Sequence, residues 1–458
     1  MRSIVWLRRD LRLRDNVAIA QACKSAEEVA LAFVVDPALL HSRRMSSSIV
    51  QCFFGAAAAL RADLRERGSD LAVLCGDPAE ELVRFARSAG ADSVFFNEDY
   101  EPFARARDAR VCDALERNGI AAHSCLDHVY FGASEIVRSD GSSYKVYTPY
   151  RKQWLAALWE RPRPAVASLR RLRDRLLPAD VIGNTHEVGT PEDFGFTSSS
   201  RYPACSERAA HNLFESFVRS GLEDYGKRRD FPALDATSHL SPQLRAGTIG
   251  IRTCVEAAKR GPAWLNELVW REFYQAILAN FPNVADGPFL SQGSRIEWRD
   301  SETDFAAWCS GETGYPIVDA AMRVLNETGW MHNRLRMIVA SFLTKDLLID
   351  WRKGERYFEQ RLADGDVAQN NGGWQWCAST GTDAVPYFRI FHPVTQGERF
   401  DPDGTFVKSV IPELRDVPSK HVHAPWRSTA PPKKYPPPIV DHATARQRAL
   451  AAYGRAFG

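Results

Sequence analysis

The sequence lacks several features that would assign it to common protein classes. None of its nine cysteines stands in a C-x-x-C pair, and their positions do not cluster. A disulfide framework, a structural zinc site or an iron–sulfur site therefore has little support, and we expect reduced thiols. No apolar run reaches the length of a membrane span, and the first ten residues, MRSIVWLRRD, lack the apolar region of a signal peptide. A cytoplasmic protein without membrane association is therefore expected.

Charge and residue spacing exclude further classes. The formal net charge of +2 over 458 residues is close to neutral, so charge alone indicates no nucleic-acid partner, although a local basic face remains open. No Ser–His–Asp spacing and no metal-ligand spacing emerges, so neither a hydrolase triad nor a metal site is expected. No G-x-G-x-x-G follows the first apolar run, which argues against a conventional NAD-binding turn.

The first part of the chain alternates short apolar runs with amphipathic stretches. This alternation predicts a Rossmann-like α/β fold, in which a parallel sheet carries helices on both faces. Residues 1–130 are therefore predicted to form one domain, with ligand sites at the carboxyl ends of its strands. The expected strands are Ser3–Leu7, Val29–Asp36, Leu71–Leu74 and Ser93–Asn97, and the expected helices lie near 16–24, 46–67, 78–89 and 102–118.

The composition then changes twice. Residues 131–205 are predicted to be an interdomain linker, because the segment from about Pro162 to Pro203 is rich in Pro, Arg, Ser and Gly and lacks periodicity. Residues 206–458 are predicted to form a second domain that is mostly α-helical. Its expected helices cover 206–221, 248–260, 264–280, 316–328, 331–349, 354–361 and 441–456.

Three runs of the second domain have unusual chemistry. The most informative is DGDVAQNNGGWQWCASTGTDAVPYFRIFHPVTQGERFD (Asp364 to Asp401), in which polar, turn-forming and aromatic residues suit a site for a flat polar ligand. The second is GWMHNRLRMIVASFLTKDLLIDW (Gly329 to Trp351), and the third is AWLNELVWREFY (Ala263 to Tyr274). Four residues of the third run share one helix face at spacings of three and four: Glu267, Trp270, Arg271 and Tyr274.

A shorter run, TSHLSPQLRAG (Thr237 to Gly247), places small hydroxyl groups near a helix start. Hydroxyls and backbone N–H groups at such a place can hold phosphate oxygens. They can also cap the helix without any ligand, a role that Thr237 or Ser241 could fill. The residues alone leave both interpretations open.

The three long runs, in their order and spacing along the chain, resemble the DNA photolyase/cryptochrome family of flavoproteins. The resemblance extends from WLRRDLRLRDN (Trp6 to Asn16) over essentially the whole chain, and it is closest to bacterial class I photolyases acting on cyclobutane pyrimidine dimers. It implies a Rossmann-like N-terminal domain that binds an antenna pigment and an all-α C-terminal domain that binds FAD. It also implies a lyase that repairs these dimers in DNA by light-dependent electron transfer from photoexcited FADH−.

Two other members of the family are the alternatives: a cryptochrome-type blue-light photoreceptor and a (6-4) photolyase. Asn370 favours repair, because plant cryptochromes characteristically carry Asp at this point and many insect ones carry Cys. Met337 and Trp270 favour repair as well. A (6-4) photolyase is expected to show a His-rich version of the WMHNRLRM helix, whereas this chain has one His there, followed by Asn333.

The resemblance implies cofactor roles for the residues that match the family's motifs. The TSHLS loop would cradle the FAD phosphates, and His239 stands where many relatives have Arg, which weakens one charge-assisted contact. Arg336 would pair with Asp364, and Asn370 would lie beside flavin N5. The implied electron-transfer chain consists of Trp374, Trp351 and Trp298. The full set of implied FAD contacts is Tyr225, Thr237, Ser238, His239, Leu240, Ser241, Trp264, Arg271, Trp330, Asn333, Arg336, Asp364, Gly365, Asp366 and Asn370.

The resemblance implies DNA contacts in the same way. Glu267 would hydrogen-bond a pyrimidine edge of the dimer, and it is implied to be catalytic together with Asn370 and the tryptophan chain. The flipped dimer would stack on Trp376, and such stacking contributes roughly 1–3 kcal/mol per base. The implied substrate and DNA contacts are Arg229, Glu267, Trp270, Arg271, Tyr274, Asn333, Arg334, Met337, Trp376, Arg389 and Gln396. Arg389 and Gln396 are expected to lie in one loop that relatives use near DNA.

A last segment concerns the antenna. FNEDYEPFARARD (Phe96 to Asp108) resembles the family's antenna-side segment, and Glu101 matches a folate-contacting carboxylate. Similar segments occur in relatives that bind a deazaflavin. We therefore expect 5,10-methenyltetrahydrofolate, with 8-hydroxy-5-deazaflavin as the alternative. The expected partner is UV-damaged DNA containing pyrimidine dimers, bound by a monomer that needs no other protein.

Overall fold

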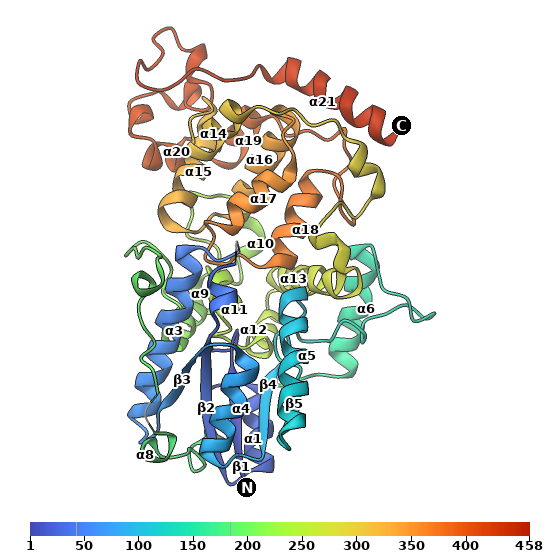
Figure 1. The fold of residues 1–458 in the computed structure, drawn as a ribbon. Helices are drawn as coiled ribbons and strands as arrows, with labels where there is room; N and C mark the ends of the chain where they lie inside the picture. Colours follow the sequence, from blue (N-terminus) through green and yellow to red (C-terminus); the bar gives the residue numbers. More distant parts are fainter. Residues whose placement is uncertain (43, 184) are drawn as a thin grey trace. The chain divides into compact units, whose positions relative to one another are not determined.

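The computed structural model describes residues 1–42, 44–183 and 185–458, and Figure 1 shows its ribbon. The chain divides into two compact units. Unit 1 comprises Met1–Ser198, Pro203–Glu223 and Ser238–Pro282. Unit 2 comprises Ser199–Tyr202, Asp224–Thr237 and Asn283–Gly458. Compactness does not decide where a domain begins, so the division at residues 130 and 205 stays a prediction.

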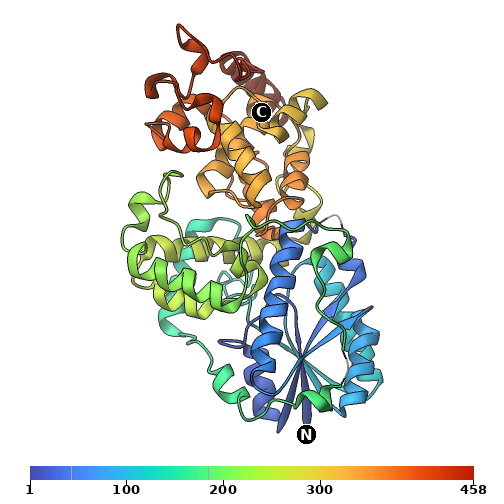
Figure 2. The same cartoon turned by 90° about the vertical axis from the view of Figure 1, so that its left-hand side faces the viewer.

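A parallel five-stranded sheet lies at the centre of unit 1. Its strands are β1 (Arg2–Leu7), β2 (Glu28–Val35), β3 (Leu71–Cys75), β4 (Ser93–Asn97) and β5 (Ala121–Cys125), in the order β3-β2-β1-β4-β5. Val5 of β1 pairs with Leu31 on one side and with Phe95 on the other, so β1 is buried at the middle of the sheet. Figure 2 shows helices on both sides of the sheet, which confirms the predicted Rossmann-like α/β fold.

Most helices around this sheet follow the predicted periodicity closely. They are α1 (Val17–Ser25), α2 (Pro37–Leu40), α3 (Ser47–Arg65), α4 (Pro78–Ala89) and α5 (Pro102–Arg117). Three elements were missed, and the first of them is the short helix α2. The side chains of β5 are mostly exposed or half-buried, so no apolar run marks that strand. Helix α6 (Tyr147–Glu160) lies inside the predicted linker, where an aromatic-rich stretch packs on another helix of unit 1.

The remaining helices of unit 1 come from the linker and from the start of the predicted helical domain. They are α7 (Ser168–Leu172), α8 (Ala179–Ile182), the 3-10 helix η1 (Pro191–Phe194), α9 (Glu207–Ser220), α11 (Ser241–Ala246), α12 (Ile251–Ala258) and α13 (Pro262–Asn280). The predicted helices 206–221, 248–260 and 264–280 are thus confirmed to within three residues at each end.

One expectation about the cysteines is wrong. Cys52 on α3 and Cys205, just before α9, form a disulfide, and both residues are buried. They stand 153 residues apart, so no sequence spacing could reveal the pair. The fold brings them together because α3 packs against α9.

Unit 2 is helical throughout. Its elements are α10 (Tyr225–Arg228), η3 (Ser291–Arg295), α14 (Glu302–Ser310), α15 (Pro316–Thr328), α16 (Asn333–Ser341), the π-helix η4 (Phe342–Asp346), α17 (Trp351–Glu359), α18 (Val367–Cys377), α19 (Pro393–Phe400), α20 (Thr405–Val410), η5 (Pro412–Leu414), η6 (Ser419–His421), η7 (Pro425–Arg427) and α21 (His442–Phe457). The 3-10 helix η2 (Pro282–Ala285) begins where unit 1 ends. The predicted helix 331–349 is therefore an α-helix that widens into a π-helical turn.

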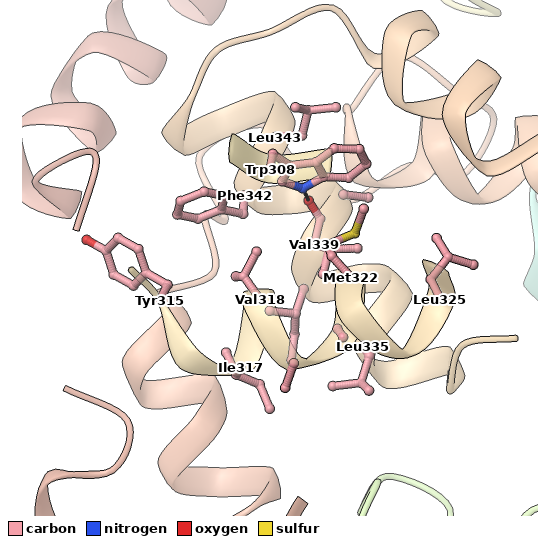
Figure 3. Close-up of a cluster of buried hydrophobic side chains, with 14 of the residues drawn as sticks. Trp308, Tyr315, Ile317, Val318, Met322, Leu325, Leu335, Val339, Phe342 and Leu343 are labelled. Carbon is pink, nitrogen blue, oxygen red and sulfur yellow. Dashed lines mark hydrogen bonds between the residues drawn. The ribbon is translucent and has the colours of Figure 1, made fainter. Parts of the chain in front are cut away.

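The core of unit 2 is built around Trp308, whose side chain is fully buried (Figure 3). Its indole Nε1 donates a hydrogen bond to the carbonyl oxygen of Val339, 3.1 Å away, so the one polar atom of the ring is satisfied. Leu335 and Met322 close the core from neighbouring helices. In the part of the chain that the structure describes, no helix is long and apolar enough to cross a membrane.

Candidate active site

The predicted site residues are divided between the two units. Unit 1 carries Glu101, Ser238, His239, Leu240, Ser241, Trp264, Glu267, Trp270, Arg271 and Tyr274. Unit 2 carries Tyr225, Arg229, Thr237, Trp298, Trp330, Asn333, Arg334, Arg336, Met337, Trp351, Asp364, Gly365, Asp366, Asn370, Trp374, Trp376, Arg389 and Gln396. Each unit therefore carries its own set of candidate site residues.

In unit 1 the candidates gather on α13, which begins with Pro262 at its first turn. Trp264, Leu268 and Phe273 face the core, whereas the four residues of the predicted face are all half-buried. The helix thus has a packed side and a side whose polar and aromatic groups remain accessible. That division confirms the shared face of Glu267, Trp270, Arg271 and Tyr274.

Arg271 has a neighbour that the sequence did not reveal. Its Nη1 donates to the carbonyl oxygen of His128, and its Nη2 lies 2.9 Å from Nε2 of the same residue. Burial lowers the pKa of His128 well below its usual value, and the nearby Arg9 and Arg271 lower it further. The neutral imidazole can therefore accept a hydrogen bond from the guanidinium, which holds Arg271 in place.

A buried carboxylate fixes the back of α13. Glu272 accepts hydrogen bonds from the backbone N–H groups of Tyr130 and Phe131, at 2.6 and 3.0 Å, and from the indole N–H of Trp154, at 2.5 Å. Burial raises the pKa of Glu272 to about 7, although these three donors act in the opposite direction. The sequence did not reveal this role of Glu272. Nothing in WREFY distinguishes a carboxylate that binds buried groups of the protein from one that contacts a ligand.

The loop from Thr237 to Ser241 leads into α11. Neither Thr237 nor Ser241 caps the helix, since the N-cap residue is Leu240 and its side chain makes no capping bond. His239 adopts a left-handed backbone conformation, with φ of 51°. Thr237 Oγ1 is buried and has no hydrogen-bond partner among the residues that the structure describes. The helix-capping interpretation is therefore wrong for both hydroxyls.

In unit 2, Asp364 and Arg336 form the ion pair that the resemblance implies. Asp364 Oδ2 lies 2.7 Å from Arg336 Nη2, and the carboxylate side chain is 4% exposed. Arg336 Nε also donates to the carbonyl oxygen of Met331, at 2.8 Å. The second oxygen, Asp364 Oδ1, is buried and accepts no hydrogen bond from the described residues. A buried acceptor in this state costs about 1–3 kcal/mol, which a ligand N–H or O–H group would offset.

Asp366 and Asn370 begin α18. Asp366 is the N-cap residue, and its Oδ1 accepts from the backbone N–H of Ala368 at 3.0 Å. Asn370 is buried, and its amide donates to the carbonyl oxygen of Glu355 at 3.0 Å. Both side chains therefore have structural bonds as well as the roles that the resemblance implies.

Two further polar residues of α18 are structural. Asn371 donates to the Glu355 carboxylate at 2.8 Å, and its own amide oxygen accepts from Gln375 at 2.9 Å. Gln375 also binds backbone groups of Val284 and Phe289. Part of the polar content of NNGGWQW thus satisfies buried groups of a neighbouring segment rather than a ligand.

The tryptophans of the implied chain differ in exposure. Trp374 and Trp351 are each 2% exposed and belong to the core of unit 2, whereas Trp298 is half-buried and packs against that core. Trp376 and Met337 also pack against it and stay half-buried. The three tryptophans of the implied chain therefore range from almost fully buried to half-buried.

Among the implied DNA contacts, Arg334 is held on two sides. Its Nη2 lies 3.0 Å from Asp230 Oδ1, and its guanidinium stacks 4.4 Å from the ring centroid of Phe400. Arg229 lies 5.3 Å over the ring of Tyr225. These contacts pre-organise both arginines on unit 2.

The remaining candidates lie at the surface or in an ion-pair network. Arg389 is exposed in a loop, but the expectation that Gln396 shares this loop is wrong. Gln396 belongs to α19, which Pro393 starts at its first turn. Glu101 of unit 1 pairs with Arg9 at 2.7 Å and with Arg245 at 3.5 Å, and its side chain is 13% exposed.

The chain is similar to known proteins over almost its whole length. A family model described as DNA photolyase matches residues 3–167, and one described as the FAD binding domain of DNA photolyase matches residues 264–455. A Salmonella typhimurium protein named deoxyribodipyrimidine photo-lyase is 42% identical over 478 aligned positions, which cover 98% of each chain. The chain belongs to the DNA photolyase family. The predicted family is thus confirmed.

Solved structures of photolyases have the same fold. A bacterial class III photolyase from Agrobacterium tumefaciens matches with a TM-score of 0.88 and 34% identity, over 99% of this chain and 97% of that one. An archaeal photolyase from Sulfolobus tokodaii, solved with two FAD molecules, matches with a TM-score of 0.88 and 32% identity, over 99% and 100%. The predicted combination of a Rossmann-like domain with a helical FAD-binding domain is confirmed.

Proposed function

We propose that this protein is a light-dependent deoxyribodipyrimidine photo-lyase, which splits cyclobutane pyrimidine dimers in DNA. The observation that carries the proposal is the 42% identity to a protein of that name over 98% of both chains. The two matched family models cover residues 3–167 and 264–455, which include the N-terminal run and nearly all of the three long runs. FAD is the cofactor, because the matched C-terminal model is an FAD-binding domain.

The described residues fit FAD. Bound FAD supplies the absorption of light and the transfer of one electron. Asp364 Oδ1 offers a buried acceptor and Thr237 Oγ1 a buried hydroxyl that can donate to a phosphate oxygen, and neither has another partner among the described residues. Arg336 fixes the Asp364 carboxylate and adds a positive charge beside it. Asn370 is held by Glu355, so its amide keeps one orientation. We propose that these residues bind and orient the cofactor.

The half-buried face of α13 is proposed to bind the dimer. Glu267 hydrogen-bonds a pyrimidine edge, and Trp270 provides an apolar wall. Arg334 and Arg229 bind phosphate oxygens, and their contacts with Asp230 and Tyr225 support a fixed orientation before DNA arrives.

The tryptophan chain is proposed to deliver the electrons that keep bound FAD in its reduced, active state. The buried Trp374 and Trp351 and the half-buried Trp298 support this role, because they offer aromatic groups from the interior to the solvent. Asn370, which lies near the start of α18, is proposed to favour the reduced cofactor without adding negative charge.

A second chromophore is a separate part of the proposal. We propose 5,10-methenyltetrahydrofolate as the antenna, with 8-hydroxy-5-deazaflavin as the alternative, on the resemblance of residues 96–108. The ion pairs of Glu101 with Arg9 and Arg245 mean that a folate would meet an engaged carboxylate. Mass spectrometry of the small molecules released from purified protein identifies the pigment. A second FAD, as in the Sulfolobus tokodaii structure, would replace both suggestions.

The remaining expectations are also proposals. We propose that the protein acts as a monomer on UV-damaged DNA, in the cytoplasm and without an obligate protein partner. Light scattering at micromolar concentration tests the monomer, and fractionation of the host cell tests the location.

The deciding experiment uses purified protein with anaerobically reduced flavin. An oligonucleotide with one thymine dimer is illuminated, and the return of intact thymines is compared with a dark control. Light-dependent restoration supports the proposed function. Restoration only of a (6-4) lesion would replace it with the (6-4) alternative, and no repair of either lesion by flavin-loaded protein would favour a photoreceptor.

A further inference from the structure

A tyrosine outside every predicted motif lies against the proposed dimer-binding face. Tyr147 is the first residue of α6, and its ring stacks on Trp270 with centroids 3.5 Å apart and planes inclined by 8°. Both residues belong to unit 1. We propose that Tyr147 is a positioning residue for the dimer-binding Trp270. The inference rests on the proposed function and deepens it.

The hydroxyl group of Tyr147 fixes the stack in a second direction. Its oxygen lies 2.9 Å from the carbonyl oxygen of Asn266 and 2.7 Å from Asn266 Oδ1. Asn266 stands one helical turn before Trp270 on α13, so the same helix holds both ends of the tyrosine. Tyr147 is 6% exposed, which leaves its ring little room to rotate.

The helix that carries Tyr147 is itself clamped to α13. Trp154 of α6 donates to the buried Glu272, and the ring of Tyr150 lies 5.2 Å from the ring of Phe273. A buried hydrogen bond and an aromatic contact therefore join the two helices behind the stack. Movement of Tyr147 relative to Trp270 would disrupt these contacts as well.

The stack decides which face of Trp270 is available. Tyr147 covers one face of the indole, while Trp270 as a whole remains half-buried. A base or dimer can stack only on an uncovered part of the ring. The indole is thus held in one rotamer before DNA binds, so its side-chain entropy is not lost during binding. Without Tyr147, part of the affinity for the dimer would be spent on ordering Trp270.

The primary test replaces the ring by an aliphatic side chain. We expect Tyr147→Leu to weaken dark binding of a dimer-containing oligonucleotide about tenfold, which corresponds to about 1.4 kcal/mol. Binding of the same oligonucleotide without the dimer should change less than about twofold. Repair per photon at saturating DNA should stay near the wild-type value, because Tyr147 acts through binding geometry.

Two control variants separate positioning from general stability. Tyr147→Phe keeps the ring and should restore most of the affinity. Tyr144→Leu removes a tyrosine from the same segment, where the ring packs edge-on against Tyr150 at 6.2 Å and not on Trp270. It should bind the dimer like the wild type. If Tyr147→Leu does not fold, Tyr147→Met serves in its place, with flavin content and thermal unfolding as checks.

A double-mutant cycle with Trp270→Leu gives the sharpest result. If Tyr147 acts through Trp270, Tyr147→Leu should cost no further affinity once the indole is removed. Equal losses in both backgrounds would overturn the inference, and so would unchanged dimer binding by folded Tyr147→Leu. Failure of the wild type to repair any dimer would instead contradict the proposed function, so the two failures are distinguishable.

Discussion

Helices α13 and α18 both carry predicted site residues, one helix in each unit, and they hold these residues differently. On α13 the candidate side chains lie on a half-buried face. Groups from other segments of unit 1 hold the helix in place: the Tyr147 ring stacks on Trp270, and the Tyr130 backbone N–H and the Trp154 indole donate to Glu272. On α18 the polar side chains are themselves buried, and Asn371 and Gln375 bind one another and nearby backbone groups.

The difference teaches where each helix is vulnerable. A substitution in the groups that pack against α13 should alter how precisely its half-buried face is positioned for a ligand, because the face itself remains. A change beside α18 should remove a buried bond or disturb close packing, so the cofactor and the fold should suffer together. Three matched pairs of variants can break or sharpen this contrast.

The largest effect is expected for Asp364→Ala, next to α18. The substitution leaves Arg336 without the carboxylate that lies 2.7 Å from it, and breaking such a pair costs about 3 kcal/mol. It also removes the buried acceptor proposed for FAD. We expect FAD affinity to fall more than about tenfold, as measured by flavin absorbance after gel filtration, together with a lower urea midpoint.

An exposed ion pair of the same unit provides the control. Arg455 and Glu297 are 2.7 Å apart, with side chains that are 60% and 73% exposed. Arg455→Ala should therefore leave both the flavin content and the urea midpoint nearly unchanged. Normal FAD binding by Asp364→Ala would contradict the placement of the cofactor beside this carboxylate.

A smaller, pH-dependent effect is expected behind α13. Glu272 has a pKa of about 7 in the folded protein, against an ordinary value of 4.5. Because the folded state binds this proton more tightly, the stability from Glu272 is fully present below about pH 4.5 and is lost as the pH rises through 7. That loss amounts to about 3 kcal/mol across the window.

Glu272→Gln removes the titration. We expect the stability difference between the wild type and this variant to favour the wild type most near pH 5 and to shrink toward pH 8, in urea unfolding followed by tryptophan fluorescence. Glu256→Gln on α12, where the carboxylate is 64% exposed, should show no such trend. A constant difference from pH 5 to 8 would mean that Glu272 stays ionised in the folded state.

Much of this architecture could be predicted from the sequence. Four of the five strands of unit 1 were found because buried parallel strands are short, continuous apolar runs, as in IVWL of β1. The face of α13 was found because Glu267 and Arg271 interrupt an aromatic stripe at helical spacing. Asp364 and Arg336 came from the family resemblance rather than from any local pattern.

What stayed hidden depends on contacts between distant segments. Cys52 and Cys205 are 153 residues apart, and Tyr147 and Trp270 meet only because α6 packs on α13. Local periodicity contains no signal for either pair. For the polar residues of α18, the local pattern indicated a role that the structure does not give them. Gln375 lies in a run that suggests ligand contacts, but it satisfies buried backbone groups.

The smallest effects, and the cleanest contrast, are expected from two glycines on the helices that meet at Trp374. A Cβ atom on Gly354 of α17 would lie 2.2 Å from Trp374 Cη2 and 2.6 Å from Leu343 Cδ2, so the indole would have to move. Gly354→Ala should destabilise the protein by about 1–3 kcal/mol and slow photoreduction of the flavin.

Gly373→Ala on α18 is the matched variant. No heavy atom lies within 4 Å of the added Cβ, so the substitution should stabilise the helix by about 0.5–1 kcal/mol through its lower unfolded-state entropy. Urea unfolding of both variants measures the contrast. If Gly354→Ala were as stable as Gly373→Ala, the packing around Trp374 would be looser than the structure indicates, and α18 would resemble α13 in tolerating change. Opposite signs would instead establish that close packing against a rigid ring distinguishes this helix from α13.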